Sequence, residues 1–341
     1  MPETRTAPSL VWFRNDLRIN DNPALAAAVE AGRPILGVYL ADDLGDEQWA
    51  LGGAGRWWRH HALGDLAASL KEAGVSLLLL DARNGADIVS VAVESGAAEV
   101  FFNRRYEPDH LEGDRQAYRA LKERGIAAHA FNGSLLFDPK QVRNKSGGVF
   151  KVFTPFWKHC QTLDFPEPLA LDAEALRACQ SPPAVVKRLS GQAVALEDLG
   201  LLPEVRWDRK FEPLWTPTED GAHARISAFL VGAVDAYKED RDRPDREGTS
   251  RLSPYLRHGQ LSPAQVVAAV NRADKARAEG GRVFLSEIGW REFSYHLLYH
   301  FPDTTEAPLQ SKFAGFPWQP DPRLLKAWQR ETTDPAIGAA M

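Results

Sequence analysis

Short apolar runs of strand length alternate with amphipathic stretches over the first part of the chain. Asn22 followed by Pro23 predicts a helix start, with a side-chain cap and a proline at the first helical position, and Gly32 predicts its end. This alternation predicts a parallel sheet with crossover helices. The predicted strands are residues 9–13, 35–40, 75–80, 99–103 and 126–131, and the predicted helices are residues 23–30, 55–73, 87–94 and 108–124.

Residues 77–80 are continuously apolar, which predicts a strand covered on both faces. The fold expected for residues 7–135 is therefore a doubly wound α/β domain, whose ligands sit beyond the carboxyl ends of the strands. The turn after the first strand holds Arg14 and Arg18 but no G-x-G-x-x-G, which argues against a dinucleotide-dependent dehydrogenase. Composition alone leaves these two arginines open between solvated loop charges and a role at the sheet edge.

The pattern changes in the second half of the chain. A stretch of weak periodicity holds Gly147-Gly148 and Pro182-Pro183, and only helical patterns follow residue 211. We therefore expect a connector at residues 136–208 and an all-α domain at residues 209–341. The helices predicted in that domain are residues 221–237, 262–278, 282–299 and 322–329.

Composition narrows the class of protein. The 341 residues are 44% hydrophobic and 26% charged, enough for two globular domains, and no apolar run approaches the length of about 20 residues that crosses a bilayer. Met1 to Pro8 lacks the charged and apolar parts of a signal peptide, so we expect a cytoplasmic protein. Cys160 and Cys179 have no zinc-site spacing, and no metal is expected.

The charge balance limits any contact with nucleic acid. Lys and Arg number 41 against 46 Asp and Glu, a net charge of −5. A protein that grips phosphates over its whole surface would be basic. Any DNA contact is therefore expected to be a local patch.

A segment dense in charges, residues 237–256, is typical of a solvated loop. Its second part is more specific, because Gly248, Thr249 and Ser250 would place hydroxyls and free N–H groups at a helix start. Such a start carries partial positive charge and binds phosphate readily. Both interpretations stay open on the residues alone.

The predicted helix 282–299 has an unusual face. Phe284, Glu287, Trp290, Arg291 and Ser294 are spaced at three and four residues and share it. A carboxylate, an indole and a guanidinium together do not make a core stripe. They predict either an exposed ion pair beside a surface aromatic, which composition favours slightly, or a pocket wall that meets a planar ligand.

Four strings resemble the photolyase and cryptochrome family, and they occur in the family's order. They are residues 12–22, WFRNDLRINDN; 151–156, KVFTPF; 248–256, GTSRLSPYL; and 290–293, WREF. The chain is most similar to class I cyclobutane pyrimidine dimer photolyases. The resemblance implies a light-driven, FAD-dependent lyase that repairs pyrimidine dimers in DNA by electron transfer from reduced flavin.

The resemblance also implies roles for individual residues. Glu287 and Trp290 correspond to residues that face the DNA lesion, the carboxyl bonding base edges and the indole stacking an extruded base. Arg291 neighbours both flavin and substrate, and Trp318 corresponds to the outer member of a tryptophan chain that photoreduces the flavin. The residues that correspond to flavin contacts are Tyr237, Thr249, Ser250, Arg251, Leu252, Ser253, Phe284 and Arg291.

Two departures from the family pattern affect the expectations. The resemblance implies a possible second, antenna chromophore, methenyltetrahydrofolate or a deazaflavin. Asp109 and His110 stand where folate-binding relatives carry Asn-Glu, which argues against the folate. Residues 331–341 stand where the family continues into further helices. We therefore expect the FAD-binding domain to be incomplete, the chain to be truncated, and repair to be impaired.

Three functions stay open at this stage. The first is dimer repair, favoured by Glu287, because relatives that repair the six-four photoproduct or signal in animals usually carry glutamine there. The second is a cryptochrome-like blue-light sensor, and the third is an inactive remnant without flavin. We expect a monomer whose partner is damaged DNA, with no membrane association.

Overall fold

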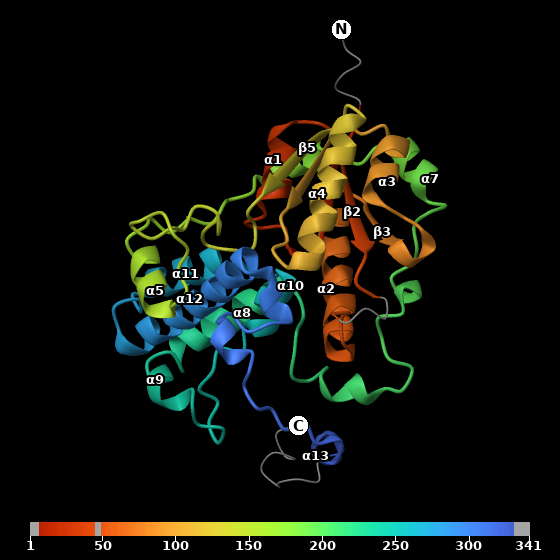
Figure 1. Ribbon diagram of the computed structural model, residues 1–341. Coiled ribbons are helices and arrows are strands. Elements are labelled where there is room, and N and C mark those ends of the chain that lie inside the picture. Colours follow the sequence, from red (N-terminus) through yellow and green to blue (C-terminus); the bar gives the residue numbers. More distant parts are fainter. Residues whose placement is uncertain (1–6, 45–48, 331–341) are drawn as a thin grey trace. The chain divides into compact units, whose positions relative to one another are not determined.

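The computed structural model describes residues 7–44 and 49–330, so residues 331–341, on which the expectation of an incomplete domain rested, lie outside it. Contacts divide the chain into two compact units, Met1–His300 and Phe301–Met341. The first unit contains a parallel sheet in the order β3-β2-β1-β4-β5, which confirms the predicted doubly wound sheet (Figure 1). Its strands are β1 (Ser9–Phe13), β2 (Ile35–Ala41), β3 (Leu77–Asp81), β4 (Glu99–Asn103) and β5 (Ala127–Phe131).

Helices cover both faces of the sheet. Side chains of α1 and α2 pack with one face, and side chains of α3, α4 and α7 pack with the other. Asn22 accepts a hydrogen bond from the N–H of Leu25 and caps α1, as its sequence predicts. These helices are α1 (Pro23–Glu30), α2 (Gly53–Glu72), α3 (Ile88–Ser95), α4 (Pro108–Glu123) and α7 (Pro183–Leu189).

Strand β3 begins two residues later than expected. The N–H of Val75 donates to the carbonyl of Leu70 and so belongs to the turn that closes α2. From Leu77 onward successive side chains enter the two opposite core clusters. The prediction that residues 77–80 are covered on both faces is therefore confirmed.

The later helices differ from their predicted bounds. The predicted helix 221–237 is wrong after Val231, because the chain turns at Gly232, whose φ of −117° and ψ of −87° are not helical. The predicted helix 262–278 ends early, before Asp274, which has a φ of 53°. The helices are α8 (Glu219–Val231), α9 (Tyr237–Asp240), α10 (Ser253–His258), α11 (Pro263–Arg272), α12 (Glu279–His300) and α13 (Pro322–Gln329).

The predicted connector contains short elements that its weak periodicity did not reveal. Within it lie α5 (Phe153–Cys160), α6 (Ala173–Ala178) and α7, all eight residues long or shorter. Three turns or fewer give too few periods for a pattern to stand out. Short 3₁₀ turns occupy Ala82–Asn84, Glu197–Leu199, Trp207–Lys210, Pro302–Thr305 and Ser311–Phe313.

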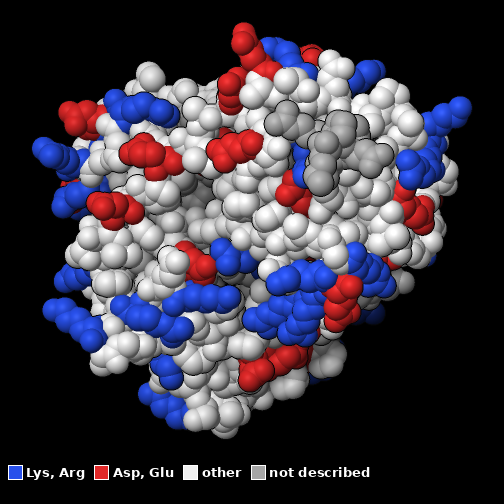
Figure 2. Space-filling view, turned by 90° about the horizontal axis from the view of Figure 1, so that it is seen from above, with Lys and Arg blue, Asp and Glu red and all other residues white. Residues whose placement is uncertain are grey.

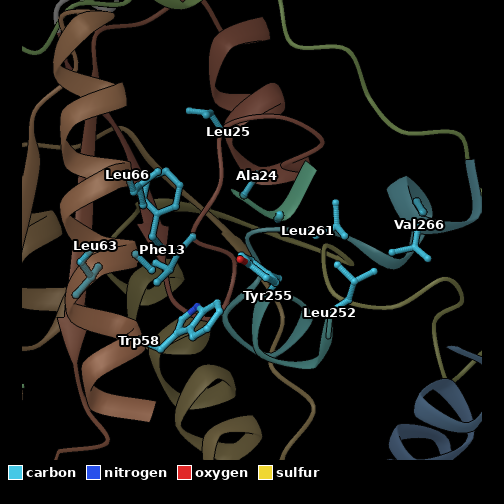
Figure 3. Close-up of a cluster of buried hydrophobic side chains, with 14 of the residues drawn as sticks. Phe13, Ala24, Leu25, Trp58, Leu63, Leu66, Leu252, Tyr255, Leu261 and Val266 are labelled. Carbon is cyan, nitrogen blue, oxygen red and sulfur yellow. The ribbon is translucent and has the colours of Figure 1, made fainter. Parts of the chain in front are cut away.

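The α/β part and the helices of the first unit share one hydrophobic core. Figure 3 shows Phe13 and Leu25 of the α/β part together with Leu252, Tyr255 and Leu261 of the helical part. The indole of Trp58 packs edge-on against the Tyr255 ring, with centroids 4.8 Å apart. This common core fixes the helices that carry the predicted site against the sheet.

Arg14 and Arg18 are both buried, 3% and 1% exposed, so neither is a solvated loop charge. The guanidinium of Arg14 lies 4.3 Å from the Trp12 ring centre and pairs with Asp114 at 3.2 Å. Arg18 donates to the carbonyls of Asp21, Gly133 and Gly259 at 2.6–3.1 Å. Arg18 therefore ties three distant stretches of backbone together.

The surface charge is uneven. Figure 2 shows one face of the molecule, on which Lys and Arg side chains gather in a band with a few acidic residues among them. A local gathering of basic side chains is compatible with a net charge of −5 for the whole chain. Among the described residues, no helix is long and apolar enough to cross a membrane.

Candidate functional site

Helix α12 forms one wall of a hollow of about 490 Å³ in the first unit. Phe284, Glu287 and Arg291 of this helix line it, as the shared face predicts, whereas Trp290 and Ser294 do not. Three of the five residues therefore form part of a pocket wall, and their contact with a planar ligand stays a prediction. The lining residues are Tyr237, Ser250, Leu252, Ser253, Leu256, Arg257, Phe284, Glu287, Ile288, Arg291 and Tyr295.

Two aromatic rings make the inner wall of the hollow. Phe284 is 3% exposed, and Tyr237 packs edge-on against it with centroids 5.4 Å apart and planes at 83°. Burial raises the pKa of the Tyr237 phenol, which keeps that wall uncharged. Leu252 and Ile288, 1% and 4% exposed, complete an apolar surface suited to a flat ligand.

An ion pair stands at the rim of the hollow. Glu287 pairs with Arg241, which follows α9, and the two side chains are 32% and 31% exposed. The hydrogen bond that Arg241 donates to this carboxylate raises the pKa of Arg241. The Arg241 guanidinium also lies 5.7 Å from the Tyr237 ring centre. This partner could not be predicted from local pattern, because the two residues are 46 positions apart.

Arg291 is held by two acceptors on its inner side. Its Nη1 donates to the Ser134 carbonyl at 2.8 Å and to Glu292 Oε1 at 3.2 Å. Glu292 is 3% exposed and also accepts from the backbone N–H groups of Leu136, at 2.8 Å, and Phe137, at 3.4 Å. Sequence reasoning missed Glu292 as the residue that orients Arg291, although it lies inside the string at 290–293.

Burial raises the pKa of Glu292 to about 7, above its ordinary 4.5. The Glu292 carboxyl therefore binds a proton more tightly in the folded chain than in the unfolded chain. Its contribution to stability is full below pH 4.5 and is lost as the pH rises through 7. We expect the free energy of unfolding to fall by on the order of 2 kcal/mol across this window. Glu292→Gln should flatten the dependence, measured by denaturant unfolding, whereas exposed Glu174→Gln should not.

The segment 248–253 differs from its prediction. Thr249 and Ser250 were expected at a helix start, but α10 begins at Ser253, because Pro254 fixes the first turn and Arg251 turns the chain with a φ of 53°. Ser250 and Ser253 line the hollow, and Thr249 is exposed and does not. A Cβ at Gly248 would lie 2.4 Å from Asp240, so glycine is required for this close approach.

Arg251 lines a second hollow, of about 470 Å³. Arg225, Thr218 and Tyr255 also line it. The guanidinium of Arg251 pairs with Glu247 at 2.9 Å, and Arg225 donates to the Ser250 carbonyl at 3.1 Å. Among the predicted flavin contacts, Arg251 and Thr249 are thus the two that the structure does not bring to the first hollow.

The two predicted tryptophans are both on the surface. Trp290 is 46% exposed, and its indole stacks on the ring of Phe153, with centroids 3.8 Å apart and planes at 10°. Trp318 belongs to the second unit and is 80% exposed, with Phe316 as a ring neighbour at 4.8 Å. Trp290 therefore has one face covered and lies one helical turn from Glu287.

The candidate antenna residues begin α4. Asp109 is exposed and His110 half-buried, and burial lowers the pKa of His110. Neither lines the neighbouring hollow of about 250 Å³, to which Leu111, Tyr118 and Arg119 of the same helix contribute. Within residues 7–44 and 49–330 no group of three or more His, Cys, Asp or Glu could hold a metal ion.

Two models of protein families match this chain. The family model "DNA photolyase" matches residues 9–174, and the model "FAD binding domain of DNA photolyase" matches residues 284–341. The deoxyribodipyrimidine photo-lyase of Agrobacterium fabrum is 38% identical over 340 residues, which cover 99% of this chain and 69% of that protein. The chain belongs to the photolyase and cryptochrome family.

Other relatives span both branches of the family. Cryptochrome-1 of Arabidopsis thaliana is 32% identical, and the match covers 98% of this chain and 49% of that protein. The crystal structure of a bacterial class III photolyase from Agrobacterium tumefaciens superposes with a TM-score of 0.87 at 37% identity, over 99% of this chain and 68% of that one. The family and fold predictions are confirmed, and so is FAD as the family's cofactor. The assignment to class I stays a prediction.

Proposed function

We propose that this protein is a deoxyribodipyrimidine photo-lyase that repairs cyclobutane pyrimidine dimers in DNA under light. The carrying observation is the arrangement on α12, where Glu287 stands at the rim of an aromatic-walled hollow and Trp290 lies one turn away with an open ring face. A photolyase needs both: a carboxylate for base edges and a platform for stacking. The class I assignment belongs to this proposal.

The hollow has the chemistry that FAD requires. Tyr237, Phe284 and Ile288 offer an apolar wall for a planar ring and exclude water from it, while Ser250, Ser253 and Arg257 offer hydroxyls and a positive charge for polar parts. Reduced FAD, when bound, supplies the electron that splits the dimer. Arg291, oriented by Glu292 and the Ser134 carbonyl, contributes a fixed positive charge to the same wall.

The remaining groups act on the substrate. Glu287 accepts hydrogen bonds from N–H groups on the base edge once its partner Arg241 turns toward DNA phosphate, and Trp290 stacks one extruded base. Because the net charge is −5, the phosphate contacts are expected to stay local. The dependence of DNA affinity on salt then measures how many of these contacts form. The expected partner is damaged DNA.

The first test is binding of two oligonucleotide duplexes that differ by a single thymine dimer. At one salt concentration, fluorescence anisotropy should give tighter binding of the dimer-containing duplex. Equal affinity for the two duplexes would contradict dimer recognition by this chain.

We expect Ser250→Ala to weaken FAD binding by about 0.5–1.5 kcal/mol, because it removes one hydroxyl from the hollow. Arg251→Ala should also weaken it, through the charge beside the same segment. Flavin fluorescence quenching measures both affinities. Ser227→Ala is the matched control, because this exposed serine on α8 bonds only the His223 carbonyl.

Unchanged titration curves for Ser250→Ala and Arg251→Ala would remove the segment from the cofactor site. Absence of any flavin binding would favour the remnant without flavin.

A second candidate is a cryptochrome-like blue-light sensor, supported by the similarity to Cryptochrome-1 of Arabidopsis thaliana. Glu287 favours repair, since its carboxylate suits the base edges of a dimer. A sensor would bind flavin and change its absorption in blue light but would show no preference for the dimer-containing duplex. The binding comparison therefore separates the two functions.

A further inference from the structure

Phe153 lies directly against the exposed tryptophan of α12. The rings of Phe153 and Trp290 are nearly parallel, with planes at 10° and centroids 3.8 Å apart. We infer that Phe153 is a positioning residue: it covers one face of the Trp290 indole and fixes the plane of the ring, so that the other face is presented to a single base. This inference rests on the proposed function, because it assigns the residue that prepares the same lesion-binding surface.

The docking of α5 on α12 explains why Phe153 reaches this place. Gly289 precedes Trp290, and a Cβ at Gly289 would lie 2.6 Å from the indole of Trp157. Trp157 therefore seats in a notch that only glycine leaves open. Phe153 lies one helical turn before Trp157 on α5. The packing of Trp157 against Gly289 therefore also places Phe153 beside Trp290.

A second set of ring contacts supports the stacked pair of Phe153 and Trp290. Phe293 packs edge-on against Phe153, with centroids 5.9 Å apart, and against Trp290 at the same distance. Phe156 packs against Phe293 with ring centroids 5.2 Å apart. Phe156 and Phe293 are 2% and 5% exposed and belong to a buried cluster, whereas Trp290 is 46% exposed. The stacked pair of Phe153 and Trp290 is thus packed against buried rings and is exposed at the surface through Trp290.

Phe153 lies at the border between the buried cluster and the surface. Lys151, Val152, Thr154 and Pro155 are all exposed, and Phe153 itself is only half-buried. The Phe153 ring packs at the edge of the buried cluster through Phe293, and it also removes rotamers from the neighbouring Trp290 indole. Because an ordered tryptophan loses less conformational entropy when a base stacks on it, the fixed ring should bind more tightly.

A spectroscopic test does not depend on DNA. In the full chain labelled with 5-fluorotryptophan, the ¹⁹F resonance that Trp290→Phe removes belongs to Trp290. Phe153→Leu, which keeps an apolar side chain, should shift and broaden that resonance, and Phe153→Tyr should restore it. A resonance unchanged by Phe153→Leu would overturn the inference.

Binding to the thymine-dimer duplex tests the consequence. Phe153→Leu should weaken it roughly 2- to 12-fold, the range for one aromatic pair, and Phe153→Tyr should bind as the unchanged protein does. In a Trp290→Ala background, Phe153→Leu should cause no further loss. An equal loss in both backgrounds would show that Phe153 acts independently of Trp290 and would overturn its positioning role.

The two experiments separate failure of the inference from failure of the proposed function. If the unchanged protein does not prefer the dimer-containing duplex, the proposed function and the lesion-binding role fail together. The ¹⁹F result would still decide whether Phe153 orders Trp290. Val152→Ala is the control variant, because Val152 is 61% exposed and precedes Phe153.

Discussion

Replacing Trp290 by alanine should weaken binding of dimer-containing DNA by about 1–3 kcal/mol, or roughly 5- to 150-fold, the range for one base stack. The indole has one face on Phe153 and is 46% exposed, so its other face is open to a base. Affinity for undamaged DNA should change little, because no base is extruded from it. Fluorescence anisotropy with the two duplexes measures both.

Trp49→Ala supplies the matched control for this substitution. Trp49 is 60% exposed, and it lies outside α12 in the sequence. The slope of affinity against salt should be the same for Trp290→Ala and the unchanged protein, since no phosphate contact is removed. Equal losses for dimer-containing and undamaged DNA would show that Trp290 supports the fold or the DNA backbone rather than the lesion.

Arg18→Ala should lower the free energy of unfolding by about 3–5 kcal/mol, as loss of a buried charge with its partners typically does. Arg18 is 1% exposed and donates to the carbonyls of Asp21, Gly133 and Gly259. Without the guanidinium, these carbonyls remain buried and unpaired. Denaturant unfolding measures the loss.

The control for Arg18 is Arg177→Ala, which removes an exposed arginine on α6 and should change stability by less than about 0.5 kcal/mol. Arg18→Lys should recover only part of the loss, because an ammonium cannot reach three separated carbonyls. If Arg18→Ala unfolds like the unchanged protein, the hydrogen bonds of Arg18 between the first loop and the end of α10 contribute nothing to the free energy of unfolding.

The sheet could be predicted because its signals are local. Asn22, Pro23 and Gly32 mark the limits of α1 within ten residues, and residues 77–80 show burial on both faces by composition alone. The face of α12 was also predictable, because Phe284, Glu287 and Arg291 follow the helical period. Local pattern fixes which residues of one helix share a side.

The partners of those residues could not be predicted, because they come from distant segments. Arg241 meets Glu287, Phe153 meets Trp290, and the Ser134 carbonyl meets Arg291, over separations of 46, 137 and 157 residues. The strings that marked the family contained Phe153 and Glu292, but no periodicity states what they contact. The burial of Arg14 and Arg18 was equally out of reach, since only tertiary packing decides whether a loop charge is solvated.

The most direct test of dimer repair is single-turnover illumination of the protein with reduced FAD and a duplex containing one thymine dimer. We predict loss of the dimer in blue light and none in the dark, with the loss abolished or strongly slowed in Glu287→Ala. Single-turnover conditions register even a slow reaction. Flavin-loaded protein that leaves the dimer intact after illumination would contradict the proposed function.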